Sequence, residues 1–126
     1  MSGKILLFGF DSLPEIVAIA AAVKPLGVEA VPVAKQEYYR TLGDLAGLDP
    51  KPAEARPYMG GPLGGRMLVL CDVREKLDEL LPALRGAGAG PECLKAVLTE
   101  HNRRWDPVAL YGELLREQQE LRGKRR

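Results

Sequence analysis

Four short apolar runs divide the chain, and a polar turn follows each of them. The runs at 5–8, 28–33, 67–71 and 94–99 are rich in Leu, Val and Ile, which is typical of β-strands. The runs at 5–8 and 67–71 are apolar at consecutive positions, so we expect both to be buried on two faces of a sheet. Pro32 cannot donate a ladder hydrogen bond, which predicts that the second strand lies at an edge.

Helical periodicity follows the first and third strands. Ser12 and Glu15 have the spacing of a capping box, and Gly27 provides a stop for the first helix. Asp72 is expected to cap the helix after the third strand, and Pro82 is expected to kink it. The predicted apolar stripe of the first helix is Leu13, Ile16, Val17 and Ala20, with Lys24 covering its end. That of the second helix is Leu77, Leu80, Leu81 and Leu84.

Two further helices are predicted outside this strand-helix-strand pattern. Thr41 is expected to cap a short helix at 41–48, and Asp106 followed by Pro107 predicts the start of a C-terminal helix. Between them, residues 49–65 are rich in Gly and Pro and predict an exposed connection without regular structure. Its glycine-rich end at 60–65 runs into a strand rather than a helix, which favours a mobile linker over a phosphate-binding loop.

The halves 4–48 and 66–121 repeat the same order of strand, capped helix, glycine, strand and helix. Within one domain spanning 1–126, this pattern predicts an α/β (α+β) fold, a ferredoxin-like split βαβ sheet of four strands with an extra C-terminal helix. In that arrangement the first and third strands are central and parallel. A doubly wound sheet is the alternative, and it would place Thr99 beside Asp11 and Asp72.

A plain split sheet leaves one face open, although its central strands are predicted to be covered on both faces. The C-terminal helix, the 41–48 helix or a second subunit must then supply the cover. A homodimer formed through a sheet face is therefore expected.

Composition narrows the class of protein. The chain has 126 residues, of which 46% are hydrophobic and 28% charged, with a net charge of +1, as is ordinary for one globular domain. No apolar stretch reaches transmembrane length.

Cys71 and Cys93 form no C-x-x-C pair, which favours two reduced core thiols in a cytoplasmic protein over a disulfide. With His101 as the single histidine, no zinc spacing exists, and no metal or cofactor is expected.

Positive charge is concentrated at the C-terminus. Residues 116–126 include five basic and two acidic side chains, and the last five, 122–126, form a basic tail. Such a tail is typical of a solvated helix end, and nucleic-acid binding through it is a second alternative function.

The segment 95–105 carries the most varied polar chemistry. It leaves a predicted strand and contains Thr99, Asn102 and the single tryptophan, Trp105. In a split sheet, the ends of the second and fourth strands meet at one edge. We therefore expect a candidate ligand site there, formed by Tyr38, Tyr39, Arg40, Thr99, Asn102 and Trp105. A structural interpretation is also open, in which Trp105 packs on Leu110 as a hydrophobic staple and Asn102 ties the turn.

The residues Lys95-Ala96-Val97-Leu98-Thr99, Asn102, Trp105 and Leu110 resemble a bacterial family catalogued as a domain of unknown function, with a K-A-V-L-T-x-x-N-x-x-W pattern. The similarity covers about residues 67–121. Glu100 and His101 depart from the Pro-Thr expected between Thr and Asn. The resemblance implies a bacterial, cytoplasmic protein and implies no activity.

These observations predict a binding or regulatory module without catalysis of its own, with a small ligand or a protein partner at the 99–105 end. No catalytic residues are assigned. The alternative is a small enzyme that uses Thr99, His101, Asn102 and Arg40, and it requires these side chains to converge on one cavity. No membrane contact is expected.

Overall fold

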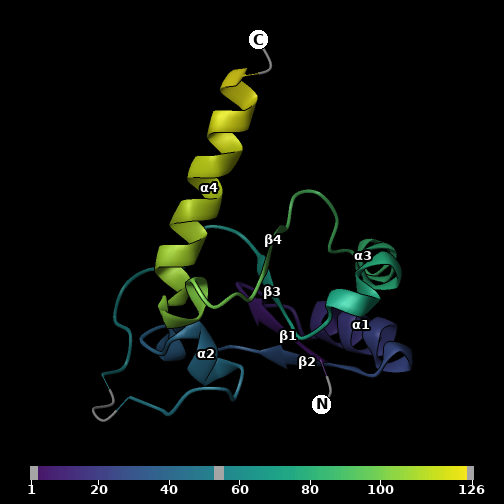
Figure 1. Cartoon of the computed structure of the whole chain (residues 1–126), viewed down its shortest axis with the longest axis horizontal. Coiled ribbons are helices and arrows are strands. Elements are labelled where there is room, and N and C mark those ends of the chain that lie inside the picture. Colours follow the sequence, from purple (N-terminus) through teal and green to yellow (C-terminus); the bar gives the residue numbers. More distant parts are fainter. Residues whose placement is uncertain (1–2, 53–55, 125–126) are drawn as a thin grey trace.

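The two most apolar runs of the sequence form the centre of a four-stranded sheet (Figure 1). The computed structural model describes residues 3–52 and 56–124, and for 122–124 only the backbone. The strands are β1 (Gly3–Phe8), β2 (Val28–Pro32), β3 (Met67–Cys71) and β4 (Leu94–Val97). The α-helices are α1 (Leu13–Val23), α2 (Leu42–Leu45), α3 (Leu77–Gly86) and α4 (Pro107–Lys124).

The strand order is β2-β1-β3-β4, with β1 and β3 in the centre and β2 and β4 at the edges as predicted. The strand directions differ from the predicted split arrangement. Each edge strand pairs in parallel with its neighbour, and β1 pairs with β3 in the antiparallel direction, with Leu6 opposite Val69. The fold is thus a mixed α+β sheet built from two adjacent β-α-β units. Both split and adjacent units produce the same order of elements along the chain, so the sequence pattern could not separate them.

The two units have similar backbone turns where their first strands end. Gly9 follows β1 with φ 79°, and Asp72 follows β3 with φ 56°. Since β1 and β3 run in opposite directions, the carboxyl ends of β1 and β2 lie at one end of the sheet. Those of β3 and β4 lie at the other end.

Successive side chains of the central strands enter two separate cores, because side chains alternate across a strand. Ile5, Leu7, Leu68 and Leu70 pack under α1 and α3 on one face. On the other face, α2, α4 and part of the 49–65 connection cover the sheet, as Figure 1 shows. That second core contains Leu6, Phe8, Met67, Val69, Cys71, Tyr38, Leu42, Leu110 and Tyr111. The chain itself therefore covers both faces without needing a second subunit for that cover, and the homodimer stays a prediction.

The side of α1 that faces the sheet matches the predicted stripe only in part, since Ile16 packs against the core as predicted. Ile19 and Val23 are fully buried, whereas Leu13 and Val17 are 70% and 56% exposed. Ser12 occupies the N-cap position without a side-chain hydrogen bond, so the predicted capping box does not form. The stripe was partly misplaced because α1 has apolar residues nearly all round, which leaves its periodicity without a preferred face.

The other predicted caps have mixed outcomes. Thr41 accepts from the N–H of Asp44 at the start of α2, and Asp106 accepts from the N–H of Ala109 at the start of α4. Asp72 does not cap α3, because the short 3-10 turn Arg74–Lys76 comes between them and Lys76 occupies the N-cap position of α3. Pro82 lies inside α3, which continues to Gly86. Within the described ranges, no helix is both long and apolar enough to span a bilayer.

Candidate functional site

The turn after β4 is held by Thr99 and Asn102. The N–H of Thr99 donates to Asn102 Oδ1 at 2.8 Å, and the N–H of Asn102 donates to Thr99 Oγ1 at 3.1 Å. The Asn102 Nδ2 group also donates to the carbonyl of Val97 at 3.1 Å. Asn102 is buried, and all three bonds fix the backbone that leaves β4. Its contacts support the structural interpretation of this residue.

Trp105 and Arg103 connect this turn to the region around α2. The N–H of Leu42 donates to the carbonyl of Trp105 at 2.9 Å, and the Trp105 ring lies edge-on to His101 with centroids 5.2 Å apart. Arg103 donates to both carboxylate oxygens of Asp49, at 2.6 and 3.1 Å. This bidentate pair lowers the pKa of Asp49 below its ordinary value, chiefly through the hydrogen bonds from Arg103.

A cavity of about 530 Å³ opens beside this turn, at the carboxyl ends of β3 and β4. We call it the β3–β4 pocket. Its polar side is formed by residues that follow the two strands, and its apolar wall by Leu48, Val73, Val97 and Leu98. The complete lining is Leu48, Asp72, Val73, Arg74, Val97, Leu98, Thr99, Glu100 and Arg103.

The charged groups of the β3–β4 pocket are not all neutralised. Arg103 pairs with Asp49 and, at 3.3 Å, with Glu100. Asp72 and Arg74 have no hydrogen bond or ion pair from their side chains to any described residue. Arg74 is also exposed, so its guanidinium is available to an incoming group.

A second cavity, of about 410 Å³, lies at the opposite end of the sheet, beside the carboxyl ends of β1 and β2. We call it the β1–β2 pocket. Its lining comes from the two strand ends and the glycine-rich segment: Gly9, Phe10, Asp11, Val33, Ala34, Lys35, Tyr38, Pro62, Leu63, Gly64, Gly65 and Arg66. That segment packs closely, since a Cβ at Gly9 would lie 2.3 Å from the Gly65 carbonyl oxygen. A Cβ at Gly65 would lie 2.6 Å from the Tyr111 hydroxyl. These two glycines therefore meet a packing requirement that the linker interpretation did not include.

Tyr38 and Arg66 form two fixed walls of the β1–β2 pocket. The Tyr38 ring lies between Phe8 and Tyr58, with centroid distances of 6.0 and 5.4 Å. Burial raises the pKa of Tyr38, a hydrogen bond from the Gly9 backbone opposes that shift, and the charge of Asp11 adds to it.

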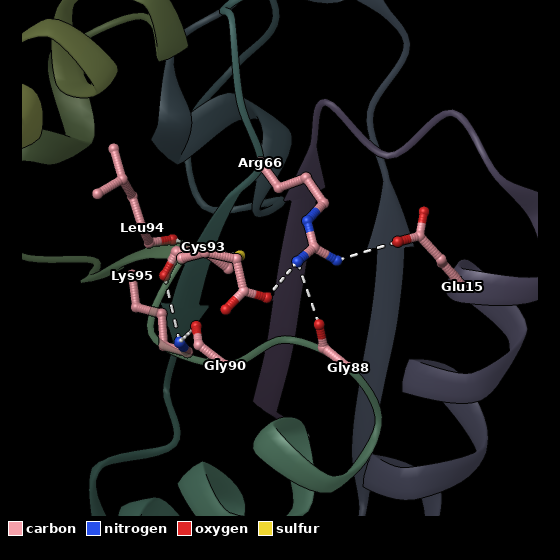
Figure 2. A network of polar contacts seen from close by, with 8 residues as sticks. Glu15, Arg66, Gly88, Gly90, Cys93, Leu94 and Lys95 are labelled. Atoms are coloured by element: carbon pink, nitrogen blue, oxygen red, sulfur yellow. Dashed lines mark hydrogen bonds and ion pairs between the residues drawn. The ribbon is translucent and has the colours of Figure 1, made fainter.

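Figure 2 shows how the donors of Arg66 are used. One terminal nitrogen donates to Glu15 at 3.1 Å, and the other donates to Glu92 at 2.6 Å and to the Gly88 carbonyl at 3.1 Å. The guanidinium also lies 5.3 Å from the centroid of the Phe10 ring. Arg66 thus joins the start of α1 to the loop before β4, and its charge is largely neutralised.

The six candidate residues from the sequence do not line one common cavity. Tyr38 lines the β1–β2 pocket, Thr99 lines the β3–β4 pocket, and Trp105 lines a shallow hollow beside α4. Arg40 forms a bidentate pair with Asp44, at 2.7 and 2.8 Å. Tyr39 is half-buried and lines none of these cavities.

The candidate residues from the sequence include none of the charged residues that line the two pockets, although the doubly wound alternative named Asp11 and Asp72. Asp11, Lys35, Asp72 and Arg74 all follow strands within a few residues. Their position after strand ends was a usable signal, because ligands bind outside the carboxyl ends of parallel strands. Without the strand order, however, the sequence could not show which strand ends lie together. Thr99 in fact lies with Asp72 and apart from Asp11.

The convergence that the enzyme alternative requires is not found. Thr99 lines the β3–β4 pocket, and the Asn102 side chain is used by the backbone of its own turn. Arg40 pairs with Asp44, and His101 is exposed against Trp105. Burial raises the pKa of the Cys71 thiol to about 11 and also raises that of Cys93. In the described part of the chain, no group of His, Cys, Asp and Glu residues could hold a metal ion.

The turn after β4 and nearly all of the β3–β4 pocket lie within the segment that matches a known protein family. Residues 66–121 match the family model of DUF3783, a domain of unknown function. The extent agrees with the resemblance noted over 67–121. The DUF3783 segment contains β3, α3, β4 and most of α4, and every residue that lines the β3–β4 pocket except Leu48 lies inside it. A comparison with curated proteins found no match, and neither did a comparison with solved structures.

The predicted basic tail, 122–126, begins near the end of α4. The side chains of residues 122–126 lie outside the described part of the chain. Arg116, at the start of the basic segment, pairs with Glu113 and Glu120 on the same helix. In Figure 1, the C-terminal half of α4 projects away from the sheet.

Proposed function

We propose that the chain is a non-catalytic binding module that receives a small ligand in the β3–β4 pocket. The ligand carries an anionic group, a carboxylate or a phosphate, on an apolar body. The single observation that supports this most strongly is the exposed Arg74 guanidinium, which lines the pocket without a partner among the described residues.

The two sides of the pocket suit the two parts of such a ligand. An arginine fork binds carboxylates and phosphates through paired hydrogen bonds, which gives both orientation and affinity. Leu48, Val73, Val97 and Leu98 offer apolar surface opposite that charge, and Leu48 is 48% exposed. Covering this surface on binding would contribute about 25 cal/mol per Å².

The turn at 99–103 supports binding by being rigid rather than by chemistry of its own. Thr99 and Asn102 fix its backbone, and Arg103 is held by Asp49. A wall that is already ordered loses little conformational entropy when a ligand binds. The 99–105 end thus remains the proposed site, with Thr99 and Arg103 as its wall and Arg74 as its anchor.

Hexanoate tests this proposal in an NMR titration of the full chain. We expect hexanoate to move the backbone amide signals of residues 72–74 and 97–103, and hexan-1-ol, which lacks the anion, to leave them unchanged. Acetate is expected to bind more weakly than hexanoate because it lacks the apolar body. Equal responses to hexanoate and hexan-1-ol would contradict the proposed role of the anion.

Variants at two arginines provide the matched control. Arg74→Gln is expected to weaken hexanoate binding about tenfold, the size of one lost charge-assisted interaction. Arg85→Gln removes an exposed arginine of α3 outside the pocket and should leave binding unchanged. Unaltered hexanoate affinity in Arg74→Gln would remove Arg74 as the anchor.

The cytoplasm is the proposed compartment. Cys71 and Cys93 are both free and buried, as is usual for thiols in a reducing environment. Their measured redox state in protein isolated under alkylating conditions tests this point, and a disulfide between them would contradict it.

A further inference from the structure

The β1–β2 pocket has no part in the proposed function and lies at the opposite end of the sheet from the β3–β4 pocket. Strands β1 and β2 run side by side to their ends, where the N–H of Val33 donates to the carbonyl of Leu7 at 2.9 Å. The turns that follow, at 9–11 and 33–35, therefore leave the sheet next to each other. They bring Asp11 and Lys35 into the lining of one cavity.

Asp11 and Lys35 are the two charges of this pocket that remain available. Both are exposed, and neither side chain has a hydrogen bond or ion pair to any described residue. The third charged residue, Arg66, is already engaged by Glu15, Glu92 and the Gly88 carbonyl. The pocket thus offers one free carboxylate and one free ammonium group.

Apolar and backbone surfaces complete the cavity. Phe10, Val33, Tyr38 and Leu63 line it, and the rings of Phe8 and Tyr58 hold Tyr38 in place. Gly64 and Gly65 expose backbone rather than side chains to the pocket. A cavity of about 410 Å³ falls within the usual range for small-molecule sites.

We propose that the β1–β2 pocket binds a zwitterion, namely a free α-amino acid with an apolar side chain. Asp11 receives the ammonium group, Lys35 receives the carboxylate, and the apolar wall around Tyr38 receives the side chain. An anion without an ammonium group would pair with Lys35 alone, and a cation without a carboxylate would pair with Asp11 alone. A ligand that carries both charged groups on one carbon satisfies both residues together.

Three related probes separate the contributions of the two charges. In NMR titrations of the full chain, L-leucine is expected to move the amide signals of residues 9–11 and 33–35. N-acetyl-L-leucine lacks the ammonium group and L-leucinamide lacks the carboxylate, so each should bind about tenfold more weakly. Equal affinity for the three probes, or no shift at these residues with L-leucine, would overturn the proposal.

Exchanging each charged residue identifies its partner on the ligand. Asp11→Asn should weaken L-leucine binding about tenfold without weakening N-acetyl-L-leucine, whereas Lys35→Gln should weaken L-leucine without weakening L-leucinamide. Asp78→Asn and Lys51→Gln, at exposed positions outside the pocket, are the matched controls and should bind as the wild type does. The proposed roles would be overturned if Asp11→Asn weakened N-acetyl-L-leucine, if Lys35→Gln weakened L-leucinamide, or if the control variants lost as much affinity for L-leucine. The hexanoate titration is followed at the amide signals of the β3–β4 pocket and the L-leucine titration at those of the β1–β2 pocket. Either proposal can therefore fail without the other.

Discussion

Thr99 and Asn102 hold each other's backbone through two reciprocal hydrogen bonds of 2.8 and 3.1 Å. The arrangement closes the turn after β4 in the way that a capping box closes a helix start. The T-x-x-N spacing in the sequence is therefore explained by backbone geometry, without any ligand.

Replacing Asn102 should test this structural role. Asn102→Ala removes the two hydrogen bonds made by the buried side chain, to the Thr99 N–H and the Val97 carbonyl, and is expected to lower the free energy of unfolding by about 1–3 kcal/mol. Asn102→Asp keeps the oxygen acceptor but loses the Nδ2 donor to Val97, so a smaller loss is expected. Urea denaturation measures both changes, and Thr99→Ser, which keeps the hydroxyl, should remain close to the wild type. Wild-type stability in Asn102→Ala would show that these bonds contribute nothing.

Gly9 should not tolerate a side chain. Its φ of 79° is unfavourable for other residues, and a Cβ would lie 2.3 Å from the Gly65 carbonyl oxygen. Gly9→Ala is therefore expected to lower the free energy of unfolding by about 2 kcal/mol or more. Gly112→Ala is the control, because Gly112 lies within α4 and its Cβ would meet open space. That change should raise stability by about 0.5–1 kcal/mol. Equal effects at the two glycines would contradict the close approach between Gly9 and Gly65.

The Asp49–Arg103 pair should make stability depend on pH in the acid range. The pKa of Asp49 is lowered in the folded protein from its ordinary value of 3.8, so the unfolded state binds the proton more tightly. The pair therefore contributes stability above pH 4 and loses that contribution as the pH falls through the lowered pKa.

Asp49→Asn should accordingly be less stable than the wild type at pH 7, and the difference should shrink below pH 4. Urea denaturation at pH 7 and pH 3 measures it, with Asp78→Asn at an exposed position of α3 as the control. A difference that is the same at both pH values would show that the charge of Asp49 is not the cause.

Several features of the fold could be predicted from local patterns. The apolar runs identified all four strands, and Pro32 correctly placed β2 at an edge, because these depend on burial and on the missing proline N–H. The direction of the strands could not be predicted. The two strands of a β-α-β unit either pair directly or leave room for another strand between them, and the local sequence is the same in both cases. The face of α1 was also beyond the sequence, because Leu13 and Val17 are as apolar as the buried Ile19.

The candidate site was predicted only in part, for a related reason. Thr99 was recognised because it follows an apolar strand, and it does line a pocket. Tyr38 was grouped with it on the assumption of a split sheet, in which the ends of the second and fourth strands meet. The observed strand directions separate Tyr38 from Thr99, and they place Arg74 and Lys35, which no motif marked, at the two pockets.

The antiparallel pairing of β1 with β3 gives the molecule two opposite poles, each with a pocket formed mainly by one β-α-β unit. In any titration, the signals of one pole are an internal reference for the other. The same separation would let one pole gain, lose or change its ligand while the other kept its geometry.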